Sequence, residues 1–331
     1  MSKVYLVTGA AGHLGSTIVR KLTEMGKKIR ILILPDEKNL PEGNYELFHG
    51  DVCIKESLGD FFDNQSKDDF IVVHCAGIVS IASKYIQKVY DVNVTGTKNI
   101  VDLCIEHKVK KLVYVSSVHA IPEKKKGETI TEVNQFNPDD VIGLYAKTKS
   151  EATGYVLSAV KNGLDASVVH PSGICGPYDN GRGHITTLVI DYIKRRLTSG
   201  VGGGYDFVDV RDVADGIIAC CEKGRAGECY ILSNKYYTVR EVLHMLHEIT
   251  GRKEIKSFLP LWFIKLTAPI AELYYKILKQ PPLFTPYSIY TINSNASFSH
   301  EKASAELGYE TRDFKQTLVD TIEWLKMNKR I

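Results

Sequence analysis

One stretch decides the fold: Thr8-Gly9-Ala10-Ala11-Gly12-His13-Leu14-Gly15, which directly follows the short apolar run Val4–Val7 and opens a segment with helical periodicity. A glycine-rich turn between a strand and a helix leaves the N–H groups of the first helical turn available to bind phosphate. Gly9 can make the tight turn, Gly12 lets the main chain approach a diphosphate, and Gly15 permits close packing of the helix on the strand. The stretch predicts a dinucleotide site, against the alternative of a plain strand-to-helix turn.

The first half of the chain alternates short apolar runs with helical segments, which is typical of a parallel sheet covered on both faces. Right-handed crossovers between such strands give a doubly wound α/β sheet, the Rossmann fold. The predicted strands are Val4–Thr8, Ile29–Leu34, Tyr45–His49, Phe70–Cys75, Lys111–Ser116 and Ala166–His170. The predicted helices are Leu14–Met25, one that begins over Leu58–Phe62, Val89–His107 and Tyr145–Lys161.

The second half of the chain is less regular, and the pattern loosens after Pro171. It predicts strands at Phe207–Val210 and Tyr230–Ser233, and helices at Val213–Glu222, Val239–Thr250 and Phe314–Asn328. We therefore predict two parts. The NAD(P)-binding Rossmann domain takes residues 1–174 and a returning segment at about 205–235. A smaller, mixed C-terminal lobe, formed by 175–204 and 236–331, binds the substrate over the carboxyl ends of the strands.

Composition excludes several classes of protein. A net formal charge of +3 over 331 residues gives no reason to expect nucleic acid, and flanking Glu residues make Lys124–Lys126 a solvated loop. Seven cysteines without a CxxC pair indicate reduced thiols and no metal site, and the N-terminus carries no signal-peptide pattern. We expect a cytoplasmic protein.

The segment Phe258–Leu278 is apolar and aromatic, but two prolines and three charged residues interrupt it. A membrane-spanning helix needs about 20 nearly uncharged residues, so we expect no transmembrane segment. Three interpretations stay open, namely a lid over an apolar substrate, ordinary core packing and a shallow membrane contact.

A second motif carries chemistry: Tyr145-Ala146-Lys147-Thr148-Lys149. Residues four apart share one face of a helix, so Tyr145 and Lys149 can point at one ligand. An ammonium, helped by an oxidised nicotinamide, stabilises phenolate and lowers the tyrosine pKa from its usual value of about 10, which lets the phenol exchange a proton near neutral pH. Alone the pattern is weak, but the predicted strand Lys111–Ser116 ends in two hydroxyls, Ser116 and Ser117.

In order along the chain, these motifs resemble the extended short-chain dehydrogenase/reductase superfamily and its NAD-dependent epimerase/dehydratase family. Gly50-Asp51-Val52, Val72-Val73-His74-Cys75-Ala76-Gly77 and Asn93-Val94-Thr95-Gly96-Thr97 match further motifs of that family. The resemblance implies a catalytic triad of Ser117, Tyr145 and Lys149, and an architectural role for Asn93. It also implies cofactor contacts from Gly9, Ala11, Gly12, His13, Leu14, Asp51, Val52, Cys75, Ala76, Gly77, Ser116, Tyr145, Lys149, Pro171 and Ser172.

The choice between NAD and NADP depends on the end of the second strand. An acid there would bind the ribose hydroxyls of NAD, whereas a basic residue would pair with the 2′-phosphate of NADP. The sequence has Ile33-Leu34-Pro35, with Asp36 a little late and Arg30 or Lys38 within reach of a phosphate. This favours NADP over NAD.

Departures from the family pattern reduce the number of reactions that we expect of this chain. Val118 and His119 stand where dehydratases carry an Asp-Glu pair, and Tyr205 stands where nucleotide-sugar enzymes commonly carry Arg. The chain thus resembles dihydroflavonol-4-reductase-like and 3β-hydroxysteroid-dehydrogenase-like proteins, in which Asp209, Arg211 and Asp212 would be structural. We predict an oxidoreductase that interconverts a ketone and a secondary alcohol, acting on a small molecule, with a hydrophobic ketone as one candidate.

Two alternatives remain, a nucleotide-sugar epimerase with tightly bound NAD and a non-catalytic dinucleotide-sensing protein. Relatives often form homodimers through the helices predicted here at Val89–His107 and Tyr145–Lys161. His119 is expected to face substrate or solvent, and His74 and His170 to be strand-end residues with satisfied hydrogen bonds.

Overall fold

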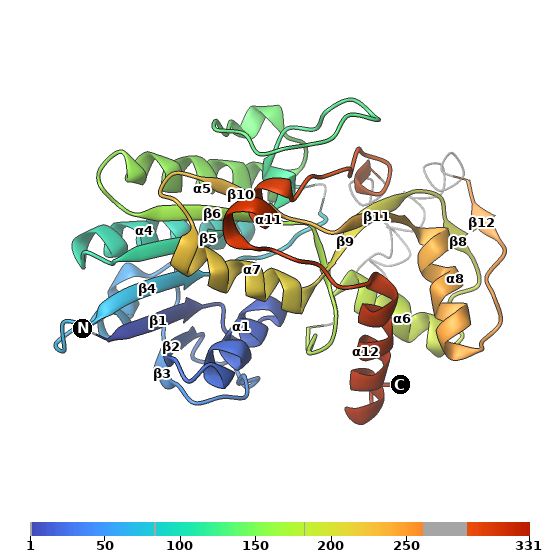
Figure 1. The fold of residues 1–331 in the computed structure, drawn as a ribbon, viewed down its shortest axis with the longest axis horizontal. Coiled ribbons are helices and arrows are strands. Elements are labelled where there is room, and N and C mark those ends of the chain that lie inside the picture. The colour runs from blue at the N-terminus through green and yellow to red at the C-terminus, as the bar shows by residue number, and fades with distance from the viewer. Residues whose placement is uncertain (1, 83, 182, 261–289) are drawn as a thin grey trace.

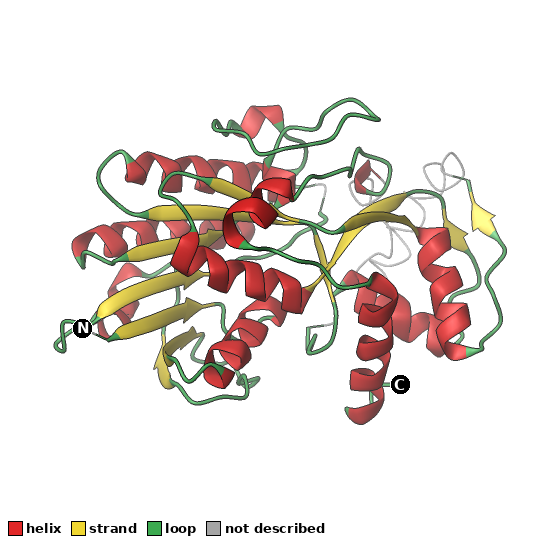
Figure 2. Ribbon diagram, in the orientation of Figure 1, coloured by secondary structure: helices red, strands yellow, loops and turns green. Residues whose placement is uncertain are grey.

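The computed structural model describes residues 2–82, 84–181, 183–260 and 290–331, and it has the predicted α/β fold (Figures 1 and 2). Its main sheet has seven parallel strands in the order β10-β6-β5-β4-β1-β2-β3, so the strand order reverses between β1 and β4, as in a Rossmann sheet. The strands are β1 (Lys3–Thr8), β2 (Lys28–Ile33), β3 (Glu46–His49), β4 (Asp69–His74), β5 (Lys111–Val115), β6 (Ala166–Pro171) and β10 (Cys229–Leu232).

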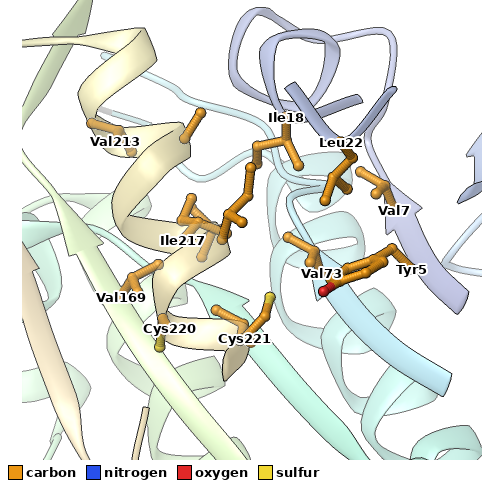
Figure 3. Packing of buried hydrophobic residues seen from close by; sticks show 14 of the residues in the cluster. Tyr5, Val7, Ile18, Leu22, Val73, Val169, Val213, Ile217, Cys220 and Cys221 are labelled. Atoms are coloured by element: carbon orange, nitrogen blue, oxygen red, sulfur yellow. The ribbon is translucent and has the colours of Figure 1, made fainter. Parts of the chain in front are cut away.

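Helices cover both faces of this sheet, because the side chains of each central strand are buried on both sides. Tyr5 and Val7 pack with α1 and α7, while Val4 and Leu6 pack with α2, α4 and α5. Figure 3 shows the first of these two cores, in which Cys220 and Cys221 are free, buried thiols. The covering helices are α1 (His13–Glu24), α2 (Gly59–Phe62), α4 (Gly96–Glu106), α5 (Leu144–Val160), α7 (Val210–Lys223) and α11 (Glu301–Leu307).

The predicted helix Val89–His107 is not continuous. The structure has α3 (Gln87–Tyr90), a π-helical segment over Asp91–Thr95, and then α4. Asn93 lies in the π segment, where its amide accepts a hydrogen bond from the Ile78 N–H (2.7 Å) and donates to the Ile78 carbonyl (3.0 Å). Asn93 thereby fixes the main chain that follows β4, in agreement with its expected architectural role.

The lobe contains a three-stranded sheet, β11-β9-β7, and a short strand pair, β8 and β12. Its elements are β7 (Gly173–Cys175), α6 (His184–Ile193), β8 (Gly200–Val201), β9 (Gly204–Asp209), β11 (Lys235–Thr238), α8 (Val239–Thr250), β12 (Phe258–Leu259) and α12 (Phe314–Met327). Within the returning segment 205–235, α7 and β10 pack with the main sheet, whereas β9 belongs to the small one. Within the described ranges, every helix is too short or too polar to cross a bilayer. From residue 261 on, the segment Phe258–Leu278 lies outside these ranges.

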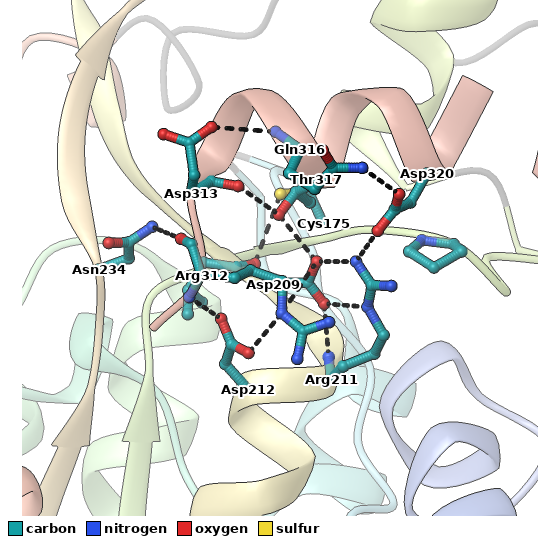
Figure 4. A network of polar contacts seen from close by, with 12 residues as sticks. Cys175, Asp209, Arg211, Asp212, Asn234, Arg312, Asp313, Gln316, Thr317 and Asp320 are labelled. Atoms are coloured by element: carbon teal, nitrogen blue, oxygen red, sulfur yellow. Dashed lines mark hydrogen bonds and ion pairs between the residues drawn. The ribbon is translucent and has the colours of Figure 1, made fainter. Parts of the chain in front are cut away.

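A network of ion pairs joins α12 to the start of α7 (Figure 4). The fully buried carboxylate of Asp209 accepts hydrogen bonds from Arg211 (2.6 Å) and from the Thr317 hydroxyl (2.8 Å). Arg211 also pairs with Asp320 (2.6 Å), and Arg312 pairs with Asp212 (2.6 Å). The structure agrees with the structural role expected for Asp209, Arg211 and Asp212.

We predict that Asp209→Ala lowers the free energy of unfolding by about 3–5 kcal/mol, because it leaves Arg211 without its buried partner. Asp215→Ala is the matched control, since its pair with Lys21 is largely exposed and should contribute less than about 1 kcal/mol. Urea unfolding followed by circular dichroism measures both. Equal losses in the two variants would contradict the structural role of the network.

Candidate functional site

The predicted site residues gather along the carboxyl edge of the main sheet. They follow β1 (Gly9, Ala11, Gly12, His13, Leu14), β3 (Asp51, Val52), β4 (Cys75, Ala76, Gly77) and β5 (Ser116, Ser117), or lie at the end of β6 (Pro171, Ser172). Tyr145 and Lys149 come from the first turns of α5. In open α/β sheets ligands bind at this edge, at the point where the strand order reverses.

The glycine-rich turn has the geometry that a diphosphate requires. Gly9 has φ +65°, and a Cβ there would lie 2.7 Å from the main-chain nitrogen of Ala76. A Cβ on Gly15 would lie 2.2 Å from the Gly9 carbonyl oxygen, whereas one on Gly12 would meet only that oxygen, at 3.3 Å. Gly12 is the N-cap of α1 without a side-chain cap, so the N–H groups of the first turn remain available to an anion. This turn fits a dinucleotide.

The side chains around this turn are held by the protein. His13 Nε2 bonds to the Pro177 carbonyl oxygen (2.8 Å), so its imidazole is turned toward the lobe. Ala11 and Leu14 pack on the core, and Val52 is buried. Asp51 accepts a hydrogen bond from the Cys53 N–H (2.9 Å), which orients its carboxylate at the end of β3.

Gly77 brings the chain after β4 close to α5. A Cβ at Gly77 would lie 3.2 Å from Lys149 Nζ, so the main chain approaches this ammonium closely. Lys149 donates to the Val115 carbonyl (2.8 Å), and its Nζ lies 4.9 Å from the centre of the Tyr114 ring. Burial lowers the pKa of Lys149 to about 8.

Ser117 and Tyr145 lie within hydrogen-bonding reach of each other. The Ser117 oxygen already accepts from the His119 N–H (3.2 Å), so its hydroxyl hydrogen can be donated to Tyr145. Burial raises the pKa of Tyr145 to about 12, and the hydrogen bond from Ser117 opposes that rise. The lowered Tyr145 pKa that we expect from Lys149 together with an oxidised nicotinamide stays a prediction. In the protein alone, burial outweighs the hydrogen bond from Ser117, and Lys149 donates to the Val115 carbonyl.

Two predicted cofactor contacts have hydroxyls that bond within the protein. Ser116 Oγ bonds to Thr153 Oγ1 (2.7 Å) and so faces α5, and Ser172 Oγ donates to the buried carboxylate of Asp206 (2.5 Å). Burial raises the pKa of Asp206 to about 6, although hydrogen bonds from Ser172 and Asn234 oppose that rise. Pro171 pairs with Leu232 of β10, beside the same edge.

Sequence reasoning missed Tyr114, which lies under Lys149, and Asp206, which holds Ser172. Strand alternation contains the signal for Tyr114. Tyr114 and Ser116 are two apart along the extended chain of β5 and its continuation, so they point to the same side of the sheet. Asp206 carried no such signal, since its partner is 34 residues away in the sequence.

Three histidines near this edge are neutral, since burial lowers the pKa of His74 to about 3 and those of His119 and His170 to about 4. His74 bonds at both nitrogens, to Thr8 (2.7 Å) and Thr97 (3.1 Å), as expected. Within the described ranges His170 bonds only through Nδ1, so the expectation of a satisfied side chain is half wrong. Among the described residues, no group of three or more His, Cys, Asp and Glu side chains could hold a metal ion.

A pocket of about 400 Å³ is lined by His119, whose ring centre is 6.0 Å from that of Tyr145. The expectation that His119 faces substrate or solvent stays a prediction. His119 Nε2 bonds to the Tyr205 hydroxyl (2.9 Å). The apolar and aromatic lining comes from Val118, Ile121, Ile130, Val141, Ile142, Tyr205, Tyr290 and Phe298.

Arg30, one of two basic residues considered for an NADP phosphate, is engaged elsewhere. It pairs with Glu46 (2.9 Å) and donates to the Asp63 carbonyl (2.6 Å). Lys38 and Asp36 are both exposed beyond the end of β2.

The match to a family model agrees with this site. Residues 5–233 match the model of the NAD dependent epimerase/dehydratase family, and the chain belongs to this family. It is therefore an NAD(P)-dependent enzyme of the extended short-chain dehydrogenase/reductase type.

Individual relatives share 27–28% of their residues with this chain. The sterol demethylase protein B of Methylococcus capsulatus is 28% identical over 97% of this chain and 98% of its own length. The mouse 3 beta-hydroxysteroid dehydrogenase type 7 is 27% identical over 98% of this chain and 95% of its own. The crystal structure of gox2253 has a TM-score of 0.83 and 28% identity, and the match covers 99% of both chains.

We predict that Gly15→Ala abolishes measurable NADH binding and lowers the melting temperature, because its Cβ would overlap the Gly9 carbonyl oxygen and force α1 away from β1. Gly59→Ala is the control, since a Cβ at this helical glycine meets nothing within 4 Å. Calorimetric titration with NADH and a thermal melt of both variants test this. Wild-type NADH affinity in Gly15→Ala would exclude the proposed diphosphate cradle.

Proposed function

We propose that this protein is an NAD(P)-dependent oxidoreductase that interconverts a ketone and a secondary alcohol, with Tyr145 as general acid and base. The observation that carries the proposal is the Ser117 hydroxyl within hydrogen-bonding reach of Tyr145, with Lys149 one helical turn further along α5. Cofactor contacts from the glycine-rich turn, and from the segments after β3, β4 and β6, belong to the same proposal.

The chemistry follows from these side chains. When bound, the nicotinamide supplies or takes up the hydride. In the direction of reduction, Tyr145 gives its phenolic proton to the substrate oxygen, and Ser117 orients that oxygen by a hydrogen bond. The Lys149 ammonium then stabilises the phenolate that remains, since an opposite charge nearby favours the ionised form.

The pocket favours a hydrophobic substrate. Eight of its fifteen described lining residues are aliphatic, Tyr or Phe, and burial keeps His119 neutral. The charged lining residues are Glu123, Lys124, Lys125 and Asp140. No arginine is among its described lining residues, so it lacks the bidentate partner that best holds a sugar diphosphate. The names of two relatives refer to sterols or steroids, which agrees with a flat, apolar ketone. A homodimer through α4 and α5 remains a separate proposal.

Replacing the proposed proton donor tests the reaction. We expect Tyr145→Phe to reduce turnover of steroid and flavonoid ketones by about 10²–10⁴-fold while NADH and NADPH affinities change little. Tyr155→Phe is the control, because Tyr155 lies on the same helix but bonds to Asp102 away from the site. Undiminished turnover in Tyr145→Phe would refute the assignment, and tight UDP-glucose binding by the wild type would move the protein to the epimerases.

We further propose that NADP is preferred, through Lys38 beyond the end of β2. Lys38→Glu should then weaken NADPH binding by about tenfold or more and leave NADH affinity nearly unchanged, because a charge-assisted bond to the 2′-phosphate is lost. Lys28→Glu, at the opposite end of the same strand, should change neither affinity. An NADPH-to-NADH affinity ratio that is the same in all three proteins would exclude this role of Lys38.

A further inference from the structure

Among the described residues, His170 makes one hydrogen bond, and that bond reaches the Ser117 main chain just beyond β5. It lies in β6, fully buried, with Nδ1 2.9 Å from the main-chain carbonyl oxygen of Ser117. A carbonyl oxygen can only accept, so Nδ1 carries the hydrogen and the neutral ring has its lone pair on Nε2.

The other ring nitrogen, Nε2, lowers the stability of the fold. Nε2 is buried and has no hydrogen-bond partner among the described residues, and the ring stacks on Phe136 at 5.3 Å between centres with 7° between planes. Protonation does not relieve this, because burial and the positive charges of Lys149 and Lys302 keep the ring neutral. A buried acceptor without a partner is unfavourable, and a wholly apolar side chain would avoid it. The presence of a polar side chain with a donor at Nδ1 therefore needs a structural reason.

The bond to Ser117 supplies that reason. The Ser117 carbonyl also accepts from the Ala120 N–H (3.0 Å), and the Ser117 hydroxyl oxygen accepts from the His119 N–H (3.2 Å). With the main chain held by His170 from the neighbouring strand, the hydroxyl keeps a single free hydrogen, which is within reach of Tyr145 when no ketone is bound.

We propose that His170 is a positioning residue that holds the Ser117 main chain and thereby keeps the Ser117 hydroxyl directed at Tyr145. The inference rests on the proposed function, because it links His170 to Tyr145, the proton donor of that reaction. His170 touches neither substrate nor reacting atoms and acts through Ser117 alone.

The test is the ionisation of Tyr145 in the protein loaded with NAD⁺, followed by nuclear magnetic resonance of isotope-labelled tyrosine Cζ atoms. The Tyr145 signal is identified by its loss in Tyr145→Phe. Removing a hydrogen bond to a phenolate should raise the Tyr145 pKa by about one pH unit in His170→Phe and in Ser117→Ala alike. The titratable groups near Tyr145, namely His119, Tyr114 and, one turn along α5, Lys149, are unchanged in these proteins.

Two further variants separate positioning from general disruption. His170→Asn places an amide donor near the position of Nδ1 and should restore the wild-type ionisation of Tyr145. The double variant His170→Phe/Ser117→Ala should show no larger shift than Ser117→Ala alone, because both changes remove the same bond. An unshifted Tyr145 in His170→Phe, a failure of His170→Asn to restore it, or additive shifts in the double variant would overturn the proposal.

The experiment needs no ketone substrate, so it separates this proposal from the proposed function. If the shifts occur and no ketone is turned over, the positioning role stands and the reaction is wrong. If turnover depends on Tyr145 but His170→Phe leaves its ionisation unchanged, the reaction stands and the role of His170 is wrong.

Discussion

The contact between the glycine-rich turn and the chain after β4 is the constraint on which the rest of the structure depends. With Gly9 in a left-handed conformation and its Cα against the Ala76 main chain, no side chain can occupy this position. Gly15 lets α1 lie directly on that turn. The first turn of α1 then opens at the carboxyl edge, and the body of the helix packs on α7. The buried Asp209 is the N-cap of α7 and accepts a hydrogen bond from Thr317 of α12. The packing of α1 on α7 is therefore connected to the ion-pair network that joins α12 to α7.

Burial determines the charges at the site. Taking Tyr145 and Lys149 out of water disfavours the ionised form of each, so their pKa values move apart, to about 12 and about 8. In ordinary solution the two groups ionise at nearly the same pH. The buried pair therefore favours neutral phenol, and phenolate forms only when further positive charge or hydrogen-bond donors reach this edge. Ser117 is the donor that the protein itself contributes.

The sequence predicted the fold closely and the site partly, and the difference has a physical cause. Strand β1 ends and helix α8 begins at the predicted residues, because an apolar run, a glycine turn and a capping Thr238 are local signals. The π-helical segment at Asn93 interrupts a helix whose apolar periodicity looks continuous. Sequence periodicity does not show this interruption, because Asn93 bonds there to Ile78 in another segment. Likewise, the direction of Ser116 and the bond between His170 and Ser117 depend on which strands and helices become neighbours.

The division between edge and lobe explains why the substrate is harder to infer than the chemistry. Ser117, Tyr145 and Lys149 are fixed by one strand end and one helix, so 33 residues of sequence contain the pattern. The pocket instead draws on residues from 118 to 298, and its inner pair joins His119 to Tyr205 of β9, 86 positions away. The small sheet positions β9 by pairing it with β7 and β11. Changes in the lobe can therefore reshape the pocket while the main sheet keeps the reacting groups in place.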